Sequence, residues 1–348
     1  MSPLATADAA WDTVVDDAPV AVTAAAGLVA VAGADGTAWV LDAATGEPVA
    51  TVTLPGGILA AGLSPNGAHL ALAGPFGHAL WSRALGTTHV AATGAWSSAV
   101  RWAGTDRVAV ASGRRALVLG VDGRELWTTD PAPSTVTDLA WHREGRRLAT
   151  AAYNGVRCYE RHSRRPVVEY PYLGSHLALA IAPTGKWICS GNQDASIHIW
   201  RILPQPSAGG TPIGDLTMHG YPEKISRLAF DDTGFWLASD GAPDITVWDF
   251  AGPGPEGTRP RTLRAHETVT ALAWRPGGGG VLASAGAEGV LALWRATTGR
   301  PGAQLTPTQA TEYDQAVTAL AWSGPDLLVH ADWQGRVRAT RLPAALTR

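Results

Sequence analysis

Residues 268–296, TVTALAWRPGGGGVLASAGAEGVLALWRA, contain three short apolar segments separated by two turns. The first segment alternates and ends at Trp274, the second is VLASAG, and the third ends at Trp294. A run of four glycines follows the first segment, and Glu288-Gly289 separates the second from the third. Alternating apolar residues between glycine turns are typical of antiparallel β-strands. The segment therefore predicts three strands of an antiparallel sheet.

The same pattern recurs seven more times along the chain. The other copies occupy residues 21–43, 60–82, 98–120, 135–161, 177–202, 224–250 and 316–342. The last apolar position of the third strand falls at Leu41, Trp81, Leu119, Tyr159, Trp200, Trp248, Trp294 and Thr340, at intervals of 38 to 48 residues. A repeat of this length is one supersecondary unit that buries its faces by stacking on its neighbours.

The repeats resemble those of the WD40-repeat proteins, in which a period of this length ends in Trp-Asp or a variant of it. Trp248-Asp249 is the one literal Trp-Asp pair, and Trp81-Ser82, Trp200-Arg201 and Trp294-Arg295 are variants. The resemblance covers nearly the whole chain and implies an all-β propeller of eight four-stranded blades. Seven blades is the alternative, if the weak copy at 98–120 is absorbed elsewhere. We expect one domain over residues 8–348, with residues 1–7 as a disordered tail.

The last blade lacks a fourth strand in the sequence that follows Thr340, because only eight residues remain. Residues 10–16, AWDTVVD, precede the first repeat and have the pattern of an unassigned strand. We therefore expect this N-terminal strand to complete the last blade and close the ring. Closure by both ends removes sheet edges that would otherwise promote aggregation.

Composition limits the classes of function. The 348 residues are 46% hydrophobic and 16% charged, with a formal net charge of −3, so a sizeable core is expected and a nucleic-acid or acidic-membrane partner is not. No run of about 18 apolar residues predicts a membrane span. Two cysteines, Cys158 and Cys189, are too few for a disulfide scaffold or a thiolate metal site. We expect a cytoplasmic protein.

No catalytic motif stands out. The sequence contains no G-x-S-x-G, H-E-x-x-H, C-x-x-C or phosphate-loop pattern, and the repeats leave no separate catalytic domain. His176, His219, His266 and the pair His330/Asp332 are assigned to connections of different blades, with no spacing that makes them converge on a metal. We therefore predict no catalytic residue, cofactor or metal.

The resemblance implies a structural role for one polar set. In WD40 proteins, the residues at the positions of His266, Ser284, Glu288 and Trp294 form a hydrogen-bonded ladder within one blade. The repeat at 177–202 keeps Ser190, Asp194 and Trp200 but has no histidine at the equivalent spacing. The ladder side chains are accordingly not candidates for a catalytic pair.

Aromatic side chains point to a binding surface. In a WD40 blade, the connections between blades and the loops between strands two and three share one face, the top. The residues assigned to this face are Tyr153, Tyr170, Tyr172, Tyr221, Tyr313 and Trp333, with Phe76 and Trp96 in comparable loops. Exposed Tyr and Trp are enriched at protein interfaces. The alternative is that individual rings pack against their own blades as loop plugs.

A basic patch is the second candidate surface. The fourth repeat carries HREGRR at 142–147 and RHSRR at 161–165, both on the bottom face. Its arginines are Arg143, Arg146, Arg147, Arg161, Arg164 and Arg165. Such a patch is suited to an acidic partner segment. The alternative is a pair of solvated hairpins.

These observations favour a non-enzymatic scaffold that binds one or more proteins through its top face, as WD40 proteins generally do. The segment 218–260, with a long loop after Trp248, resembles stand-alone bacterial WD40 proteins, some of them encoded near CobW-type GTP-dependent metal chaperones. The alternative is a small-molecule or metal-binding protein, or an enzyme, with its site at the mouth of the central channel.

Overall fold

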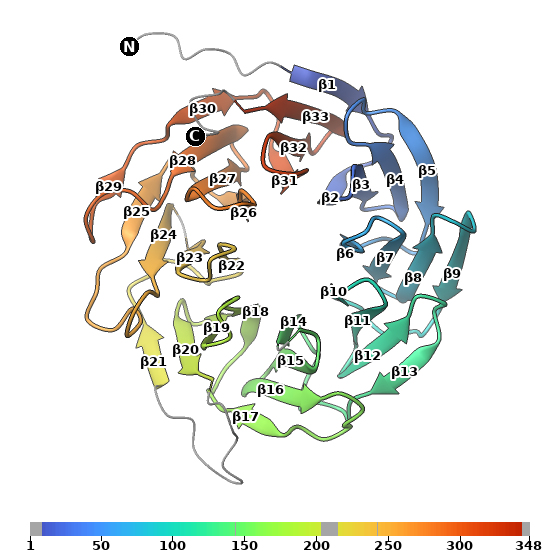
Figure 1. The fold of residues 1–348 in the computed structure, drawn as a ribbon, viewed down its shortest axis with the longest axis horizontal. Helices are drawn as coiled ribbons and strands as arrows, with labels where there is room; N and C mark the ends of the chain where they lie inside the picture. Colours follow the sequence, from blue (N-terminus) through green and yellow to red (C-terminus); the bar gives the residue numbers. More distant parts are fainter. Residues whose placement is uncertain (1–8, 143, 203–214, 242, 343–348) are drawn as a thin grey trace.

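The computed structural model of the chain describes residues 9–142, 144–202, 215–241 and 243–342. In these residues the strands form eight sheets, arranged as a ring around a central channel (Figure 1). Each sheet is one blade, with its first strand at the channel and its last at the perimeter. The predicted all-β, eight-bladed propeller is confirmed, and the seven-bladed alternative is wrong because residues 98–120, together with the strand that follows them, build a separate four-stranded blade.

Blades 1 to 4 are antiparallel meanders of four consecutive strands. Blade 1 contains β2 (Pro19–Ala25), β3 (Leu28–Gly33), β4 (Thr37–Asp42) and β5 (Pro48–Thr53). Blade 2 contains β6 (Ala60–Leu63), β7 (His69–Gly74), β8 (Gly77–Ser82) and β9 (Thr87–Ala91). Blade 3 contains β10 (Val100–Ala103), β11 (Arg107–Ser112), β12 (Arg115–Gly120) and β13 (Glu125–Thr128). Blade 4 contains β14 (Asp138–His142), β15 (Arg147–Ala152), β16 (Gly155–Glu160) and β17 (Val168–Tyr170).

Blades 5 to 8 complete the ring with two departures from the meander. Blade 5 contains β18 (His176–Ile181), β19 (Trp187–Asn192), β20 (Ile197–Arg201) and β21 (Asp215–Met218). Blade 6 contains β22 (Leu228–Phe230), β23 (Trp236–Ser239), β24 (Asp244–Asp249), β25 (Arg261–Arg264) and the added β29 (Gln304–Leu305). Blade 7 contains β26 (Val269–Trp274), β27 (Val281–Gly286), β28 (Val290–Arg295) and β30 (Gln309–Glu312). Blade 8 contains β31 (Val317–Trp322), β32 (Leu327–Asp332), β33 (Arg336–Arg341) and β1 (Ala9–Val14).

The N-terminal strand closes the ring, as predicted. Strand β1 pairs antiparallel with β33, with Ala9 opposite Thr340 and Val14 opposite Arg336. Asp12 of β1 accepts hydrogen bonds from the Arg336 guanidinium at 2.6–2.9 Å. The Trp11 indole N–H donates to the Ala43 carbonyl of blade 1 at 2.8 Å, so the closing strand also ties blade 8 to blade 1.

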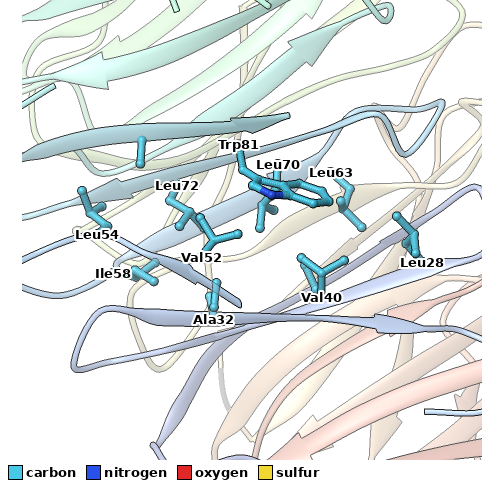
Figure 2. Close-up of a cluster of buried hydrophobic side chains, with 13 residues drawn as sticks. Leu28, Ala32, Val40, Val52, Leu54, Ile58, Leu63, Leu70, Leu72 and Trp81 are labelled. Carbon is cyan, nitrogen blue, oxygen red and sulfur yellow. The ribbon is translucent and has the colours of Figure 1, made fainter. Parts of the chain in front are cut away.

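The hydrophobic core lies between the blades. Figure 2 shows one such core, in which Leu28 and Val40 of blade 1 belong to the same buried cluster as Leu63, Leu70 and Trp81 of blade 2. The second strands are covered on both faces, and every residue of β3, β15, β19, β27 and β32 is buried. Both faces of such a strand must be apolar or small, which explains why these segments are near-continuous apolar runs.

Tryptophans at the ends of innermost strands link neighbouring blades. Each of these indole N–H groups donates to a backbone carbonyl in the innermost strand of the preceding blade. The pairs are Trp102 to Gly62, Trp141 to Arg101, Trp274 to Ala229 and Trp322 to Ala273, at 2.7–3.0 Å. These bonds hold the channel wall together where β-ladders do not reach from one blade to the next.

Blade 6 carries a fifth strand that the sequence did not predict. Strand β29 lies in the connection between β28 and β30 of blade 7 and pairs parallel with β25. Arg261 of β25 holds the same connection, because its guanidinium donates to the carbonyls of Thr298 and Gly299 at 2.7 and 2.8 Å. Its stem is buried and its charge lies 4.5 Å from the centre of the Trp236 ring. The outer edge of blade 6 is thereby covered.

Candidate functional site

The top face consists of the loops between strands two and three of each blade and the connections between blades. These two sets of loops are bonded to each other through the backbone: Tyr313 N–H donates to the Gly289 carbonyl, and Val15 N–H donates to that of Gly335. Gly335 has a φ of +88°, and a side chain there would meet the Val15 carbonyl oxygen at 2.1 Å. The close approach fixes the loops in place. The top face is therefore a pre-organised surface, which lowers the entropy cost of binding.

Five large apolar side chains are exposed on this face. Their exposed fractions are 61% for Phe76, 51% for Trp96, 43% for Tyr153, 77% for Leu173 and 56% for Trp333. All five lie in loops of the top face, from blades 2, 4 and 8 and from the connections that enter blades 3 and 5. Exposed rings on rigid loops have the composition of an interface core.

Two of the predicted top-face aromatics, Tyr153 and Trp333, are exposed. Tyr170 is not, because it lies on β17 and packs against Trp200, with 5.6 Å between ring centres. The prediction for Tyr170 is wrong. Tyr170 is the last residue of β17, directly before the loop, and the sequence pattern did not show on which side of that boundary it lies.

The remaining three tyrosines are half-buried against their own blades, so their predicted exposure is wrong as well. Tyr172 donates to the Asp194 carboxylate at 2.7 Å, and its ring centre lies 4.1 Å from that of His198. Tyr221 accepts the Trp248 indole N–H at 2.9 Å. Tyr313 lies 4.8 Å from His330, with the Arg338 guanidinium over its ring. A phenol that reaches an internal polar partner gains more from that bond than from water.

Sequence reasoning assigned no site role to Leu173 and did not select Phe76 and Trp96 from the comparable loops. The Phe76 ring rests over Gly56, where an added Cβ would be 2.5 Å away. Phe76 and Leu173 have no polar atom that could join the hydrogen bonds that hold Tyr172 and Tyr221 inward. Trp96 and Tyr153 have one and are exposed nonetheless, so residue type alone does not separate the two groups.

The polar ladder of blade 7 is a continuous hydrogen-bonded set. His266 Nε2 lies 2.7 Å from Ser284 Oγ, and its Nδ1 lies 2.7 Å from the Glu288 carboxylate. The Trp294 indole N–H donates to the same Ser284 oxygen at 2.8 Å. Burial lowers the pKa of His266, against the opposing effect of Glu288. Both ring nitrogens are occupied within the blade, so the imidazole has no free nitrogen for a reacting group.

Blade 5 contains a histidine that the spacing argument missed. His176 Nδ1 lies 2.9 Å from Ser190 Oγ, and the residues are 14 positions apart instead of the 18 that separate His266 from Ser284. His176 lies at the start of β18, not in the connection where it was assigned. The imidazole reaches the serine from the neighbouring strand, across the β18–β19 pair. A fixed spacing could not detect this arrangement.

The predicted arginine patch is smaller than expected. Arg146, Arg161, Arg164 and Arg165 are exposed on the two bottom loops of blade 4, which are joined by a backbone bond from Arg161 to Arg146. Arg147 is buried and its guanidinium bonds Glu160 at 2.5 Å, so it does not belong to the patch. Arg164 pairs with Asp130 at 3.1 Å. Arg143 lies outside the described residues.

The central channel is a cavity of about 510 Å³, lined by innermost strands. Its two arginines, Arg101 and Arg227, are paired with Asp138 at 2.7 Å and with Asp240 at 3.4 Å. His330 and Asp332, assigned to a connection of blade 8, are instead buried residues of β32. Carboxylates of the ring already neutralise both channel arginines. The channel would therefore attract an anionic ligand less strongly than two unpaired arginines would.

Among the described residues, no three His, Cys, Asp or Glu side chains are placed to hold one metal ion together. No helix that is long and apolar enough to cross a bilayer occurs in the same part of the chain.

Comparisons with known proteins match the architecture. The family model described as WD domain, G-beta repeat matches residues 172–201, in blade 5, and 257–295, which end blade 6 and build most of blade 7. Human DDB1- and CUL4-associated factor 5 is 27% identical over a match 142 residues long that covers 35% of this chain. The match spans only 15% of the length of that protein.

Solved propellers superimpose over almost the whole chain. Sqt1 from Chaetomium thermophilum has a TM-score of 0.77 at 19% identity, covering 97% of this chain and 99% of its own. The same protein bound to the N-terminus of ribosomal protein L10 gives 0.76 at 17% identity, covering 94% and 97%. The computationally designed Ika8 gives 0.75 at 20% identity, covering 94% and 98%. The chain is thus an eight-bladed β-propeller, and its blades 5 to 7 contain the segments that match the WD domain, G-beta repeat model.

Proposed function

We propose that the protein is a protein-interaction module that binds a segment of a partner protein on its top face. The observation that carries the proposal is the placement of Phe76, Trp96, Tyr153, Leu173 and Trp333, all of which are exposed in top-face loops. Loops that are tied together by backbone bonds present these side chains with little freedom left to lose.

Two further observations support this function over the alternatives. The channel arginines are already paired with carboxylates, which weakens the case for a small-molecule site or an enzyme at the channel mouth. A structural neighbour, Sqt1, is described bound to the N-terminus of a ribosomal protein, so a ring of this architecture can accept a peptide end. The basic patch on blade 4 is a second candidate surface and serves as the competing outcome in the test.

A selection from a displayed peptide library tests the proposal. Peptides that bind the wild-type protein are rescreened against the double variant F76A/W96A and against the bottom-face control L85A/F235A. Leu85 and Phe235 are 75% and 42% exposed, so the control removes apolar surface of the same kind. We expect loss of a central aromatic anchor to weaken binding by about 30-fold and the control to have little effect.

The outcome that contradicts the proposal is equally defined. Peptides that keep their affinity for F76A/W96A and lose it for R161A/R165A would move the binding face to the bottom of blade 4. A library that yields no binder would argue against peptide recognition altogether. Thermal unfolding of each variant is the control for misfolding, because exposed side chains contribute little to stability.

A further inference from the structure

The charged residues of the loops are divided unequally between the two faces of the molecule. The described loops of the top face carry ten Asp or Glu residues against three Lys or Arg, whereas the described bottom loops carry eight against ten. The formal net charge of −3 therefore conceals an acidic top and a slightly basic bottom. A face with one dominant sign of charge selects partners of the opposite sign and steers their approach.

Two parts of the top face differ in character, and we call them halves although the loops over blade 6 belong to neither. We define the acidic half as the six top loops over blades 7, 8 and 1, which hold six carboxylates and no Lys or Arg. Its carboxylates are Asp16, Asp17, Asp35, Glu267, Glu288 and Asp314. Four of them are exposed and make no side-chain hydrogen bond or ion pair with a described residue: Asp16, Asp35, Glu267 and Asp314. Their charge remains available to a partner.

The apolar half is formed by the top loops over blades 2 to 5. It holds four of the five exposed apolar side chains, Phe76, Trp96, Tyr153 and Leu173, and its formal charges are limited to Arg114, Asp130 and Asp194. The acidic and apolar halves adjoin where blade 1 meets blade 2 in the ring (Figure 1). A segment that lies across this junction can therefore touch both halves.

A hollow in the acidic half can receive a side chain. A cavity of about 430 Å³ is lined by the carboxylates of Glu312, Asp314 and Asp332, by Gln315 and by two arginines, Arg336 and Arg338. Both arginines are paired, Arg336 with Asp12 and Arg338 with Asp332, and the indole N–H of Trp333 donates to Gln315 of the cavity wall. Glu312 and Asp314 have no partner among the described residues and are exposed. Free carboxylates next to an exposed indole suit a cationic side chain, through charge and through cation–π contact.

We infer that the partner of the top face is an amphipathic segment with its basic and apolar residues in separate blocks. The basic block lies over blades 7, 8 and 1, and the apolar block lies over blades 2 to 5. This inference rests on the proposed top-face function and adds the chemistry and the polarity of the partner. An acidic segment is excluded from the acidic half by like-charge repulsion.

The test compares two kinds of variant at two salt concentrations. A labelled peptide from the library selection is titrated against wild type, D35N/E267Q/D314N and F76A/W96A by fluorescence anisotropy at 50 and 500 mM NaCl. Neutralising the acidic half is expected to weaken binding about tenfold at low salt and less than about threefold at high salt, because salt screens exposed charges. Truncating the apolar half is expected to weaken binding by about 30-fold at both concentrations.

Matched controls and a second readout keep the outcomes separate. The bottom-face variant E256Q/D326N removes two exposed carboxylates and is expected to leave the affinity unchanged at both concentrations. Sequences of the selected peptides are expected to show a Lys/Arg block separated from an aromatic or aliphatic block.

Two results would overturn the two-block inference and leave the proposed function intact. In the first, the selected peptides need Phe76 and Trp96 but are acidic or uncharged. In the second, their affinity does not respond to D35N/E267Q/D314N. Peptides indifferent to both sets of top-face variants would overturn the proposed function itself.

Discussion

His330 is a buried histidine without a hydrogen-bond partner. Its ring lies on β32 with no exposed surface, and neither nitrogen has a partner among the described residues. Burial, and then the charge of Arg338, lower its pKa to about 4, with Asp332 and Asp12 opposing. In the unfolded chain the His330 imidazole therefore becomes protonated near pH 6.5, whereas in the folded chain it becomes protonated only near pH 4.

The consequence is a loss of stability as the pH falls through this window. Between pH 7 and pH 4.5, the free energy of unfolding is expected to drop by about 2 kcal/mol more in wild type than in His330→Leu. At pH 7 the variant is expected to be at least as stable, because the leucine leaves no buried polar atom unsatisfied. Urea unfolding at both pH values measures this, and an equal acid sensitivity of the two proteins would contradict it.

Ser284 is the hub of the blade 7 ladder, and we expect its role to be structural. The Ser284→Ala variant leaves both the His266 ring nitrogen and the Trp294 indole without their shared partner. We expect a loss of about 1–3 kcal/mol in the free energy of unfolding and no change in peptide binding. Thr51→Ala, which removes an exposed hydroxyl on β5, is the control. A stable Ser284→Ala protein that no longer binds its peptide would reverse the assignment.

At the scale of the side chain, sequence reasoning located residues better than it predicted their surroundings. Tyr172, Tyr221 and Tyr313 precede the innermost strands of their blades, as assigned, yet their rings turn inward. Which way a ring turns depends on whether Asp194, Trp248 or Arg338 lies within reach, and these partners come from other strands or loops of the same blade. Arg147 shows the same limit, because its partner Glu160 lies on the next strand.

At the scale of the element, the closing strand is the part of the fold that depends most on a long-range contact. Removing residues 1–14 deletes β1, and with it the Trp11 indole and the Asp12 contacts to blade 8. Loss of a buried tryptophan alone is expected to cost about 3–5 kcal/mol in the free energy of unfolding. Removing residues 1–8 is the control, and chemical unfolding compares the two truncations. Equal stability of both proteins would show that β1 does not close the ring in solution.

Elements that follow from local pattern were predicted well, and those that depend on a partner were not. The second and third strands of each blade carry enough apolar alternation to be found from sequence. Strand β29 has two residues and exists because β25 offers a free edge and Arg261 holds the preceding turn. The indole links of Trp102, Trp141, Trp274 and Trp322 depend on the register of one blade against another. A repeat pattern carries no information on that register.

At the scale of the whole molecule, eight blades follow from eight copies because no single blade can cover both of its faces. The division of the top face into acidic and apolar halves does not follow from the same pattern. It arises from loop residues such as Asp314 and Leu173, which the repeat leaves free to vary. Total charge and composition average over the two faces and so conceal the difference.

The pairing of β1 with β33 also means that the chain could begin at another blade while the blades keep the same order around the ring. Ala9 lies opposite Thr340, so the ends of these two strands are placed like the two sides of an ordinary hairpin. A circular permutant in which a short turn joins Arg341 to Ala9, with new termini at Asp122 in the exposed β12–β13 turn, is expected to fold with a thermal midpoint within about 5 °C of wild type. A permutant opened between Ala283 and Ser284, inside buried β27, is expected not to fold. The two chain ends can thus be moved to another exposed turn of the ring while the propeller keeps the same fold.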